Sequence, residues 1–213
     1  MIKGVIFDLD GLLIDSERTA HKNLNKLLEP CGVAIDTEEY VHDYLGKTVV
    51  EGINRIANLY RKDKTPDELL DIYLKYEKTA IEEGIPLKTG ALELLEYLKS
   101  KNIKIALASS SLRERAVGIL KSHNIFDYFD ELVFGYEVEK GKPAPDIFLK
   151  ACEKINVKPS EAIVLEDSEA GIQAGFSANI PVFCIPDIKK PSQPFAEKAT
   201  KILNSLNDVR ELI

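Results

Sequence analysis

The sequence predicts a doubly wound, Rossmann-like α/β domain with a mostly parallel sheet, interrupted by an inserted all-helical domain. Short apolar runs recur along the chain and are typical of strands buried on both faces of a parallel sheet. Segments with helical periodicity separate most of these runs, as in a doubly wound fold. The stretch 16–84 breaks the alternation, because it contains helical patterns but no convincing strand. Roughly 70 residues far exceed what a simple crossover needs, so we expect a separate domain there.

The expected elements follow in chain order. The first strand is the compact apolar run 4–9, and the helices of the insert follow at 17–28, 49–61 and 66–83. Later strands are expected at 103–108, 131–134, 162–165 and 180–184. Core helices are expected at 91–101, 113–123, 145–155 and 169–178, and a loop, a short strand near 200–203 and a closing helix should follow. These elements place the core domain at 1–15 and 85–213 and the inserted helical domain at 16–84.

Composition limits the kind of partner. The chain has 213 residues, 45% hydrophobic and 30% charged, which is ordinary for a globular enzyme. Its net charge of −7, with no basic stripe, argues against a nucleic-acid partner. No apolar run approaches the roughly 20 residues that cross a membrane, and we expect neither a membrane partner nor a signal peptide. The three cysteines are far apart and form no Cys-x-x-Cys pair, which suggests free thiols in a reducing cytoplasm. We also expect a monomer.

Two carboxylates stand at the end of the first predicted strand, where the chain leaves the sheet. Asp8 and Asp10 are separated by one residue and followed by Gly11, which permits a turn that other residues resist. Ligands of open α/β sheets bind outside the carboxyl ends of the strands, and alternation in an extended chain directs both acidic side chains to one side. The pair suits a hard cation such as Mg²⁺, although an acidic strand-to-loop turn is also a common structural feature.

Serines follow the second predicted strand. Ser109, Ser110 and Ser111 lie between an apolar run and a predicted helix. A hydroxyl and free backbone N–H groups at a helix N-terminus form an anion site. Serine also favours the helix N-cap, and the two roles are compatible.

A lysine in a proline-containing loop is the third candidate. The segment 139–145 reads Glu-Lys-Gly-Lys-Pro-Ala-Pro, and its prolines would hold Lys140 or Lys142 in a fixed position. A fixed ammonium neutralises phosphate as a point charge, whereas a solvated lysine pair in a turn is the structural alternative.

Two adjacent acids end the strand expected at 162–165. Glu166 and Asp167 are poor strand residues, and they suit metal ligation better than packing. Ser168, which follows them, is also a natural cap for the next helix. We therefore favour a functional interpretation of both acids.

The four motifs, in this order, resemble those of the haloacid dehalogenase superfamily. The helical insert after the first motif also matches, so the resemblance covers essentially the whole chain. The phrases DLDGLLIDSE, KPAPDIF and LEDSEAGIQA are similar to the branch that contains β-phosphoglucomutase and small sugar-phosphate phosphatases. In that branch the helical insert is a cap domain.

The resemblance implies phosphoryl transfer to Asp8, which would form an aspartyl-phosphate. Asp10 would protonate the leaving oxygen and later activate water. Ser109 would hydrogen-bond a phosphoryl oxygen, and Lys142 would offset the charge between Asp8 and the transferred group. Phosphoryl transfer needs mainly such positioning and charge neutralisation.

The resemblance also implies Mg²⁺ as the cofactor. Asp8, the backbone carbonyl of Asp10 and the carboxylate of Asp167 would hold it, and Glu166 would support it directly or through water. Dehalogenases of the superfamily lack the second aspartate, so Asp10 favours a phosphate ester as the substrate.

Hydrolysis and isomerisation are both compatible with this resemblance. The mutases grip a second phosphate with a cap arginine and a lysine after the motif serine, and the matching positions here are Val49 and Leu112. Losing two cationic contacts favours a phosphatase acting on a small phosphorylated metabolite such as a sugar phosphate. A β-phosphoglucomutase-type enzyme is the alternative, because Lys47, Arg113 or His21 could compensate.

Substrate selection is expected from the cap, which would close over the site as lids do. Gly46, Lys47 and Thr48 are the cap candidates, with a solvated helix-to-helix turn as the alternative, and Ser110 and Ser111 are the core candidates. A non-catalytic phospho-acceptor module is the alternative from another class. Receiver domains also combine acidic ligands with a lysine, but they lack a helical insert of this size.

Overall fold

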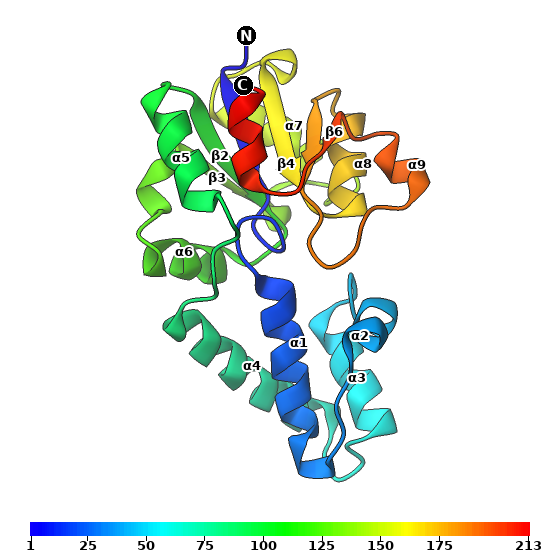
Figure 1. The fold of residues 1–213 in the computed structure, drawn as a ribbon. Coiled ribbons are helices and arrows are strands. Elements are labelled where there is room, and N and C mark those ends of the chain that lie inside the picture. Colours follow the sequence, from blue (N-terminus) through cyan, green and yellow to red (C-terminus); the bar gives the residue numbers. More distant parts are fainter. The chain divides into compact units, whose positions relative to one another are not determined.

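The structure, a computed structural model, describes residues 1–213. It divides into two compact units (Figure 1). The larger unit comprises Met1–Asp15 and Pro86–Ile213, and the smaller one comprises Ser16–Ile85. Within the larger unit the two connecting segments are joined, because the backbone N–H of Asp15 donates to the carbonyl of Pro86 at 2.8 Å.

The larger unit contains a six-stranded sheet in the order β3-β2-β1-β4-β5-β6, and every strand pairing in it is parallel. The strands are β1 (Gly4–Phe7), β2 (Lys104–Ser109), β3 (Glu131–Phe134), β4 (Ala162–Glu166), β5 (Val182–Cys184) and β6 (Lys201–Ile202). The predicted doubly wound parallel sheet is therefore confirmed, including its short last strand.

Helices cover both faces of this sheet (Figure 1). They are α5 (Ala91–Ser100), α6 (Arg113–Ser122), α7 (Asp146–Lys154), α8 (Glu169–Ser177) and α9 (Gln193–Ala196). Short 3₁₀ helices are η2 (Phe126–Tyr128), η3 (Gly135–Glu137), η4 (Pro159–Glu161) and η5 (Leu206–Glu211). The closing helix expected near the C-terminus is η5, which packs against α5.

One hydrophobic core fills the space between the sheet, α7 and α8. Alternate strand residues such as Ile6, Ala106 and Val164 face these helices and pack with Phe148 of α7 and Ile172 of α8. All five side chains are completely buried. Burying an aliphatic or aromatic side chain larger than that of alanine contributes about 1.5–3 kcal/mol, so this core holds the sheet against α7 and α8.

The smaller unit contains only helices, as the sequence predicted. They are α1 (Ser16–Leu28), η1 (Glu29–Cys31), α2 (Thr37–Asp43), α3 (Val49–Leu59) and α4 (Pro66–Glu83), with α1 and α3 both packed on α4. Helix α2 was not predicted. It buries only Tyr40 and therefore shows no apolar stripe, and its start is marked instead by the Asp36 side chain, which accepts a hydrogen bond from Glu39. None of the helices in the protein is both long and apolar enough to span a bilayer.

The first strand is shorter than the predicted run 4–9, and this difference shapes the site. Strand β1 ends at Phe7, and the chain then turns sharply, with the backbone N–H groups of Leu13 and Ile14 both donating to the carbonyl of Leu9. Asp8 and Asp10 therefore lie in a tight loop at the end of the strand instead of inside it.

Candidate active site

The sequence motifs converge where β1, β2 and β4 end, which we call the carboxyl edge. Phe7 at the end of β1 pairs with Leu107 of β2 and Leu165 of β4, so the residues that follow on the three strands are neighbours. Asp8 follows Phe7, and Glu166 follows Leu165. The edge thus gathers side chains from distant parts of the sequence.

Lys142 is the cation at the centre of this edge. Its ammonium donates to Asp8 at 2.5 Å, to Glu166 at 2.6 Å and to the backbone carbonyl of Ala108 at 3.1 Å, which occupies all three of its donors. The side chain is only 8% exposed. The loop sequence alone left Lys140 and Lys142 open, and the resemblance pointed to Lys142, which is the lysine that reaches the acids. The backbone of Lys140 instead donates to Asp146 at 3.2 Å.

The charges at the carboxyl edge do not balance. Burial alone would lower the pKa of Lys142, but Asp8 and Glu166 outweigh it and raise that pKa, so the ammonium stays charged. Burial raises the pKa of Asp8 to about 7 despite Lys142, and the charges of Glu166 and Asp10 add to this rise. Two buried carboxylates thus share one ammonium, and the edge holds an excess of negative charge.

Glu166 holds Lys142 and the loop after β4. One carboxylate oxygen accepts from Lys142, and the other accepts from the backbone N–H groups of Asp167 and Ser168 at 3.0 Å and from the Ser168 hydroxyl at 2.9 Å. The side chain of Glu166 is fully buried. This arrangement requires Gly171, since a Cβ there would lie 1.8 Å from the carboxylate carbon of Glu166. Ser168 also caps α8 by accepting from the backbone of Gly171 at 3.1 Å.

Asp10 is held by two groups from the segment after β2. The Ser111 hydroxyl donates to one oxygen of Asp10 at 2.5 Å, and the Arg115 guanidinium donates to the same oxygen at 3.0 Å and lies 2.9 Å from the other. Arg115 was not among the predicted site residues. Ser111 lies just before α6, whereas Arg115 lies in its first turn, and no local pattern distinguishes Arg115 from a solvated helix residue.

The serines of the carboxyl edge have separate environments. Ser109 is buried, and its hydroxyl accepts from the backbone N–H of Ser111 at 3.0 Å, whereas Ser110 is exposed. None of the three caps α6, because Leu112 occupies the N-cap position and forms no side-chain cap. The alternative that these serines are ordinary helix caps is therefore wrong for α6.

The donor set at this edge fits a hard divalent cation. Asp167 lies against the turn after Asp10, since a Cβ at Gly11 would be 2.2 Å from an Asp167 oxygen. Carboxylate and carbonyl oxygens are the ligands of Mg²⁺, and the excess negative charge around Asp8 favours a bound cation. No three His, Cys, Asp or Glu side chains are grouped as a metal cluster. Mg²⁺ sites do not need such a cluster, because they use one or two carboxylates together with waters and phosphate oxygens.

Candidate residues of the smaller unit are partly engaged in its own structure. Thr48 caps α3 in a reciprocal hydrogen-bonded pair with Glu51, whereas Gly46 and Lys47 lie in the preceding exposed turn. The ring of His21 stacks on Tyr40 at a centroid distance of 4.6 Å, and its Nε2 lies 2.8 Å from the carbonyl of Ile35.

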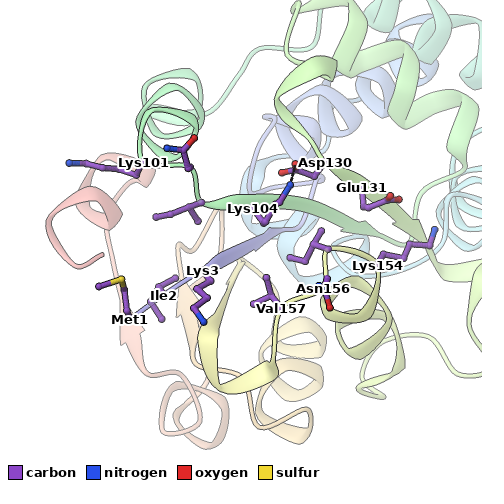
Figure 2. Close-up of a pocket in the computed structure, with 13 residues that line it drawn as sticks. Met1, Ile2, Lys3, Lys101, Lys104, Asp130, Glu131, Lys154, Asn156 and Val157 are labelled. Atoms are coloured by element: carbon purple, nitrogen blue, oxygen red, sulfur yellow. Dashed lines mark hydrogen bonds and ion pairs between the residues drawn. The ribbon is translucent and has the colours of Figure 1, made fainter.

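A hollow lies at the opposite, amino edge of the sheet (Figure 2). It has a volume of about 640 Å³ and is lined by residues that begin the strands, including Lys3, Lys104 and Glu131. Cations that line it are paired with acids in Lys104 with Asp130 at 2.8 Å and Lys3 with Glu161 at 2.6 Å. None of the predicted site residues lines it.

Comparisons with known proteins identify the same family that the motifs resemble. A family model described as haloacid dehalogenase-like hydrolase matches residues 5–185. A phosphorylated carbohydrates phosphatase from Thermotoga maritima is 31% identical over 212 residues, which cover 100% of this chain and 90% of that protein. A phosphoglycolate phosphatase from Aquifex aeolicus is 33% identical over 174 residues, covering 80% of this chain and 78% of the relative.

A solved structure extends the agreement to three dimensions. A candidate β-phosphoglucomutase from Thermotoga maritima matches with a TM-score of 0.87 and 28% sequence identity, covering 99% of this chain and 98% of that one. The resemblance predicted from the four motifs is therefore confirmed, and the protein is an enzyme whose relatives include phosphatases. Because the family model spans most of the sequence and the fold agrees along nearly all of it, the chain belongs to the haloacid dehalogenase-like hydrolase family.

Proposed function

We propose that the protein is a Mg²⁺-dependent phosphatase that hydrolyses a small phosphorylated metabolite, such as a sugar phosphate, through an aspartyl-phosphate on Asp8. The observation that carries this proposal is the buried carboxylate of Asp8 beside a fixed ammonium, with Lys142 at 2.5 Å. A carboxylate is an established nucleophile toward phosphorus, and a neighbouring cation offsets the charge of the transferred group.

The side chains have distinct roles in this proposal. Asp8 would form a bond to phosphorus while the ester bond breaks, and Asp10 would give a proton to the leaving oxygen. Asp10 would then take a proton from the water that attacks the aspartyl-phosphate. Ser109 would hydrogen-bond a phosphoryl oxygen from the end of β2, and Lys142 would hold the transferred group against Asp8.

Asp8, Asp167 and the backbone carbonyl of Asp10 would hold Mg²⁺, which would neutralise charge on the phosphate oxygens. Glu166 is better suited to a supporting role, because its oxygens already bind Lys142 and the loop backbone. We therefore assign Glu166 to orienting Lys142.

Hydrolysis is favoured over isomerisation by the residues at two positions. Val49 and Leu112 stand where β-phosphoglucomutases carry cations for a second phosphate, and neither can form a charge-assisted hydrogen bond. His21 packs within the smaller unit, and the guanidinium of Arg113 lies 5.5 Å from the ring centroid of Phe134. The curated relatives described above are named as phosphatases.

Substrate selection is assigned to the inserted helical unit acting as a cap, with the core domain at 1–15 and 85–213 and the cap at 16–84. Within the cap, we propose that the exposed turn at Gly46, Lys47 and Thr48 contacts the substrate. In the core domain, we propose that Ser110 and Ser111 contact it. We further propose a monomeric, cytoplasmic enzyme with no nucleic-acid or membrane partner, which agrees with its net charge of −7 and its free cysteines.

The test is a phosphate-release screen over phosphorylated metabolites with Mg²⁺, run beside an assay for isomerisation of β-glucose 1-phosphate. We expect phosphate release that Asp8→Asn reduces by more than about 10⁴-fold, because an amide is not a nucleophile. Circular dichroism of Asp8→Asn should match the wild type. Isomerisation with little phosphate release would establish the mutase instead. Stoichiometric labelling without turnover would establish a phospho-acceptor module.

A further inference from the structure

Arg115, Ser111 and Asp10 form a closed ring of hydrogen bonds at the carboxyl edge. One terminal nitrogen of Arg115 lies 2.9 Å and 3.0 Å from the two oxygens of Asp10, and the same nitrogen donates to the Ser111 hydroxyl at 2.8 Å. The Ser111 hydroxyl donates in turn to Asp10 at 2.5 Å. Each of the three side chains thus contacts both of the others, which restricts how the Asp10 carboxyl group can rotate.

The fold fixes where Arg115 points. Ala116 is completely buried, as are Ile119 and Leu120 one turn later, so the register of α6 against the core is set by apolar packing. Arg115 lies at the border of this buried face and is partly covered, with 20% of its side chain exposed. A helix held in this way presents the guanidinium from a rigid element, which gives better positioning than a loop does.

Position matters for Asp10 more than for an ordinary surface acid. In the proposed function its carboxyl group must reach the leaving oxygen in one step and a water molecule in the next, and general acid–base catalysis depends on that geometry. A carboxyl group that rotates freely between rotamers would spend only part of its time in the productive direction.

We infer that Arg115 is a positioning residue, an inference that rests on the proposed function. Together with Ser111, it holds the carboxyl group of Asp10 in the direction of the leaving oxygen of the phosphate ester. Arg115 acts through Asp10 and does not itself bind the transferred phosphoryl group. One terminal nitrogen of Arg115 lies close to both oxygens of Asp10 and to the Ser111 hydroxyl. A lysine would keep the charge but lacks the planar guanidinium that orients this nitrogen, so it can replace Arg115 only in part.

The experiment compares steady-state kinetics of Arg115→Ala, Arg115→Lys and the matched control Lys121→Ala with a phosphorylated metabolite that the wild type hydrolyses. Lys121 is a cation on the same helix that contacts the ring of Phe126 and lies outside the site. We expect Arg115→Ala to lower kcat by roughly 10- to 100-fold with KM changed less than about threefold, because a lost charge-assisted contact acts on the chemical step. Arg115→Lys should recover part of kcat, and Lys121→Ala should behave like the wild type.

A double-mutant cycle separates positioning from an independent effect. If Arg115 acts through Asp10, then Asp10→Asn combined with Arg115→Ala should be no slower than Asp10→Asn alone. Additive losses would overturn the inference, as would a wild-type kcat in Arg115→Ala, or a loss that appears only in KM. Melting temperatures of the variants identify any loss that comes from unfolding. A wild type without phosphatase activity, or a fully active Asp10→Asn, would instead refute the proposed function itself.

Discussion

The two edges of the same sheet gather the same residue types but use them differently. At the amino edge, Lys104 and Asp130 form an ion pair whose side chains are 53% and 24% exposed. At the carboxyl edge, Lys142 is 8% exposed and lies between Asp8 and Glu166, which are 10% and 1% exposed. The amino edge thus pairs one cation with one acid near water, whereas the carboxyl edge buries one cation between two acids.

This difference identifies which edge is suited to chemistry. Exposed ion pairs contribute about 0–1 kcal/mol and leave no charge unsatisfied. Buried charges are costly to desolvate, and an excess of buried carboxylates keeps a residual negative charge that favours binding of a cation. A fold retains such an arrangement where function requires it.

The largest effect is expected when the central cation of the carboxyl edge is removed. Lys142→Ala leaves Asp8 and Glu166 buried without their shared partner, and we expect a loss of about 3–5 kcal/mol in the free energy of unfolding. Phosphatase activity should fall by roughly 10³-fold or more, because the charge between Asp8 and the transferred group is no longer offset. Urea unfolding and phosphate release measure the two effects. Wild-type values in both would show that the carboxyl edge is an ordinary ion-pair network.

A second test uses pH to expose the uneven charge. The folded state raises the pKa of Asp8 from 3.8 to about 7, so it binds this proton more tightly than the unfolded chain does. The stabilising effect of the bound proton is therefore complete below about pH 4 and is lost as pH rises through 7.

Between pH 5 and 8, we expect the metal-free wild type to lose roughly 2–3 kcal/mol of stability relative to Asp8→Asn, which has no such proton to release. Saturating Mg²⁺ should reduce this loss, because a bound cation offsets the excess charge. Urea titrations in chelator at several pH values provide the measurement. Parallel pH profiles for the two proteins would mean that Asp8 ionises without difficulty in the fold.

Glycines at the two edges offer a third, packing-based test. A Cβ at Gly171 would lie 1.8 Å from the Glu166 carboxylate, which is already fixed by several hydrogen bonds. A Cβ at Gly4 would meet the end of the Ile155 side chain at 2.9 Å and the two methyl groups of Val157 at 3.2 and 3.3 Å, so it would press only on apolar side chains.

We therefore expect Gly171→Ala to cost roughly 1–3 kcal/mol of stability and to lower activity by displacing Glu166 and Lys142. Gly4→Ala should cost about 1 kcal/mol, because it overpacks apolar side chains only, and should leave kcat unchanged. Thermal unfolding and phosphate release of both variants are the measurements. Equal behaviour of the two variants would contradict the view that only the carboxyl edge is rigidly packed around its charges.

The sequence predicted those features of the carboxyl edge that leave a local pattern. Apolar runs located the strands, and because parallel strands end at one edge, Asp8, Ser109 and Glu166 were expected together. Two lysines two positions apart in one loop leave no such pattern. The family resemblance pointed to Lys142, and the structure places the ammonium of Lys142 against Asp8 and Glu166.

Other features depend on tertiary geometry. Gly171 reads in the sequence as a glycine inside a helix, and its necessity comes from how closely α8 approaches Glu166. Arg115 reads as a solvated helix residue, and its contact with Asp10 depends on the register of α6 against the core. Helix α2 buries a single side chain, so hydrophobic periodicity could not reveal it.

The smallest effect on stability is expected when an exposed cation of the amino edge is removed. Lys104→Ala breaks an exposed pair with Asp130, whose carboxylate keeps a hydrogen bond from the backbone of Ile105 at 2.9 Å. We expect a change of less than about 1 kcal/mol in the free energy of unfolding, which high salt should shrink further, and an unchanged kcat. The same urea and phosphate-release assays apply. A large loss of activity in Lys104→Ala would mean that the amino edge also contributes to catalysis. The view that only the carboxyl edge carries the chemistry would then be wrong.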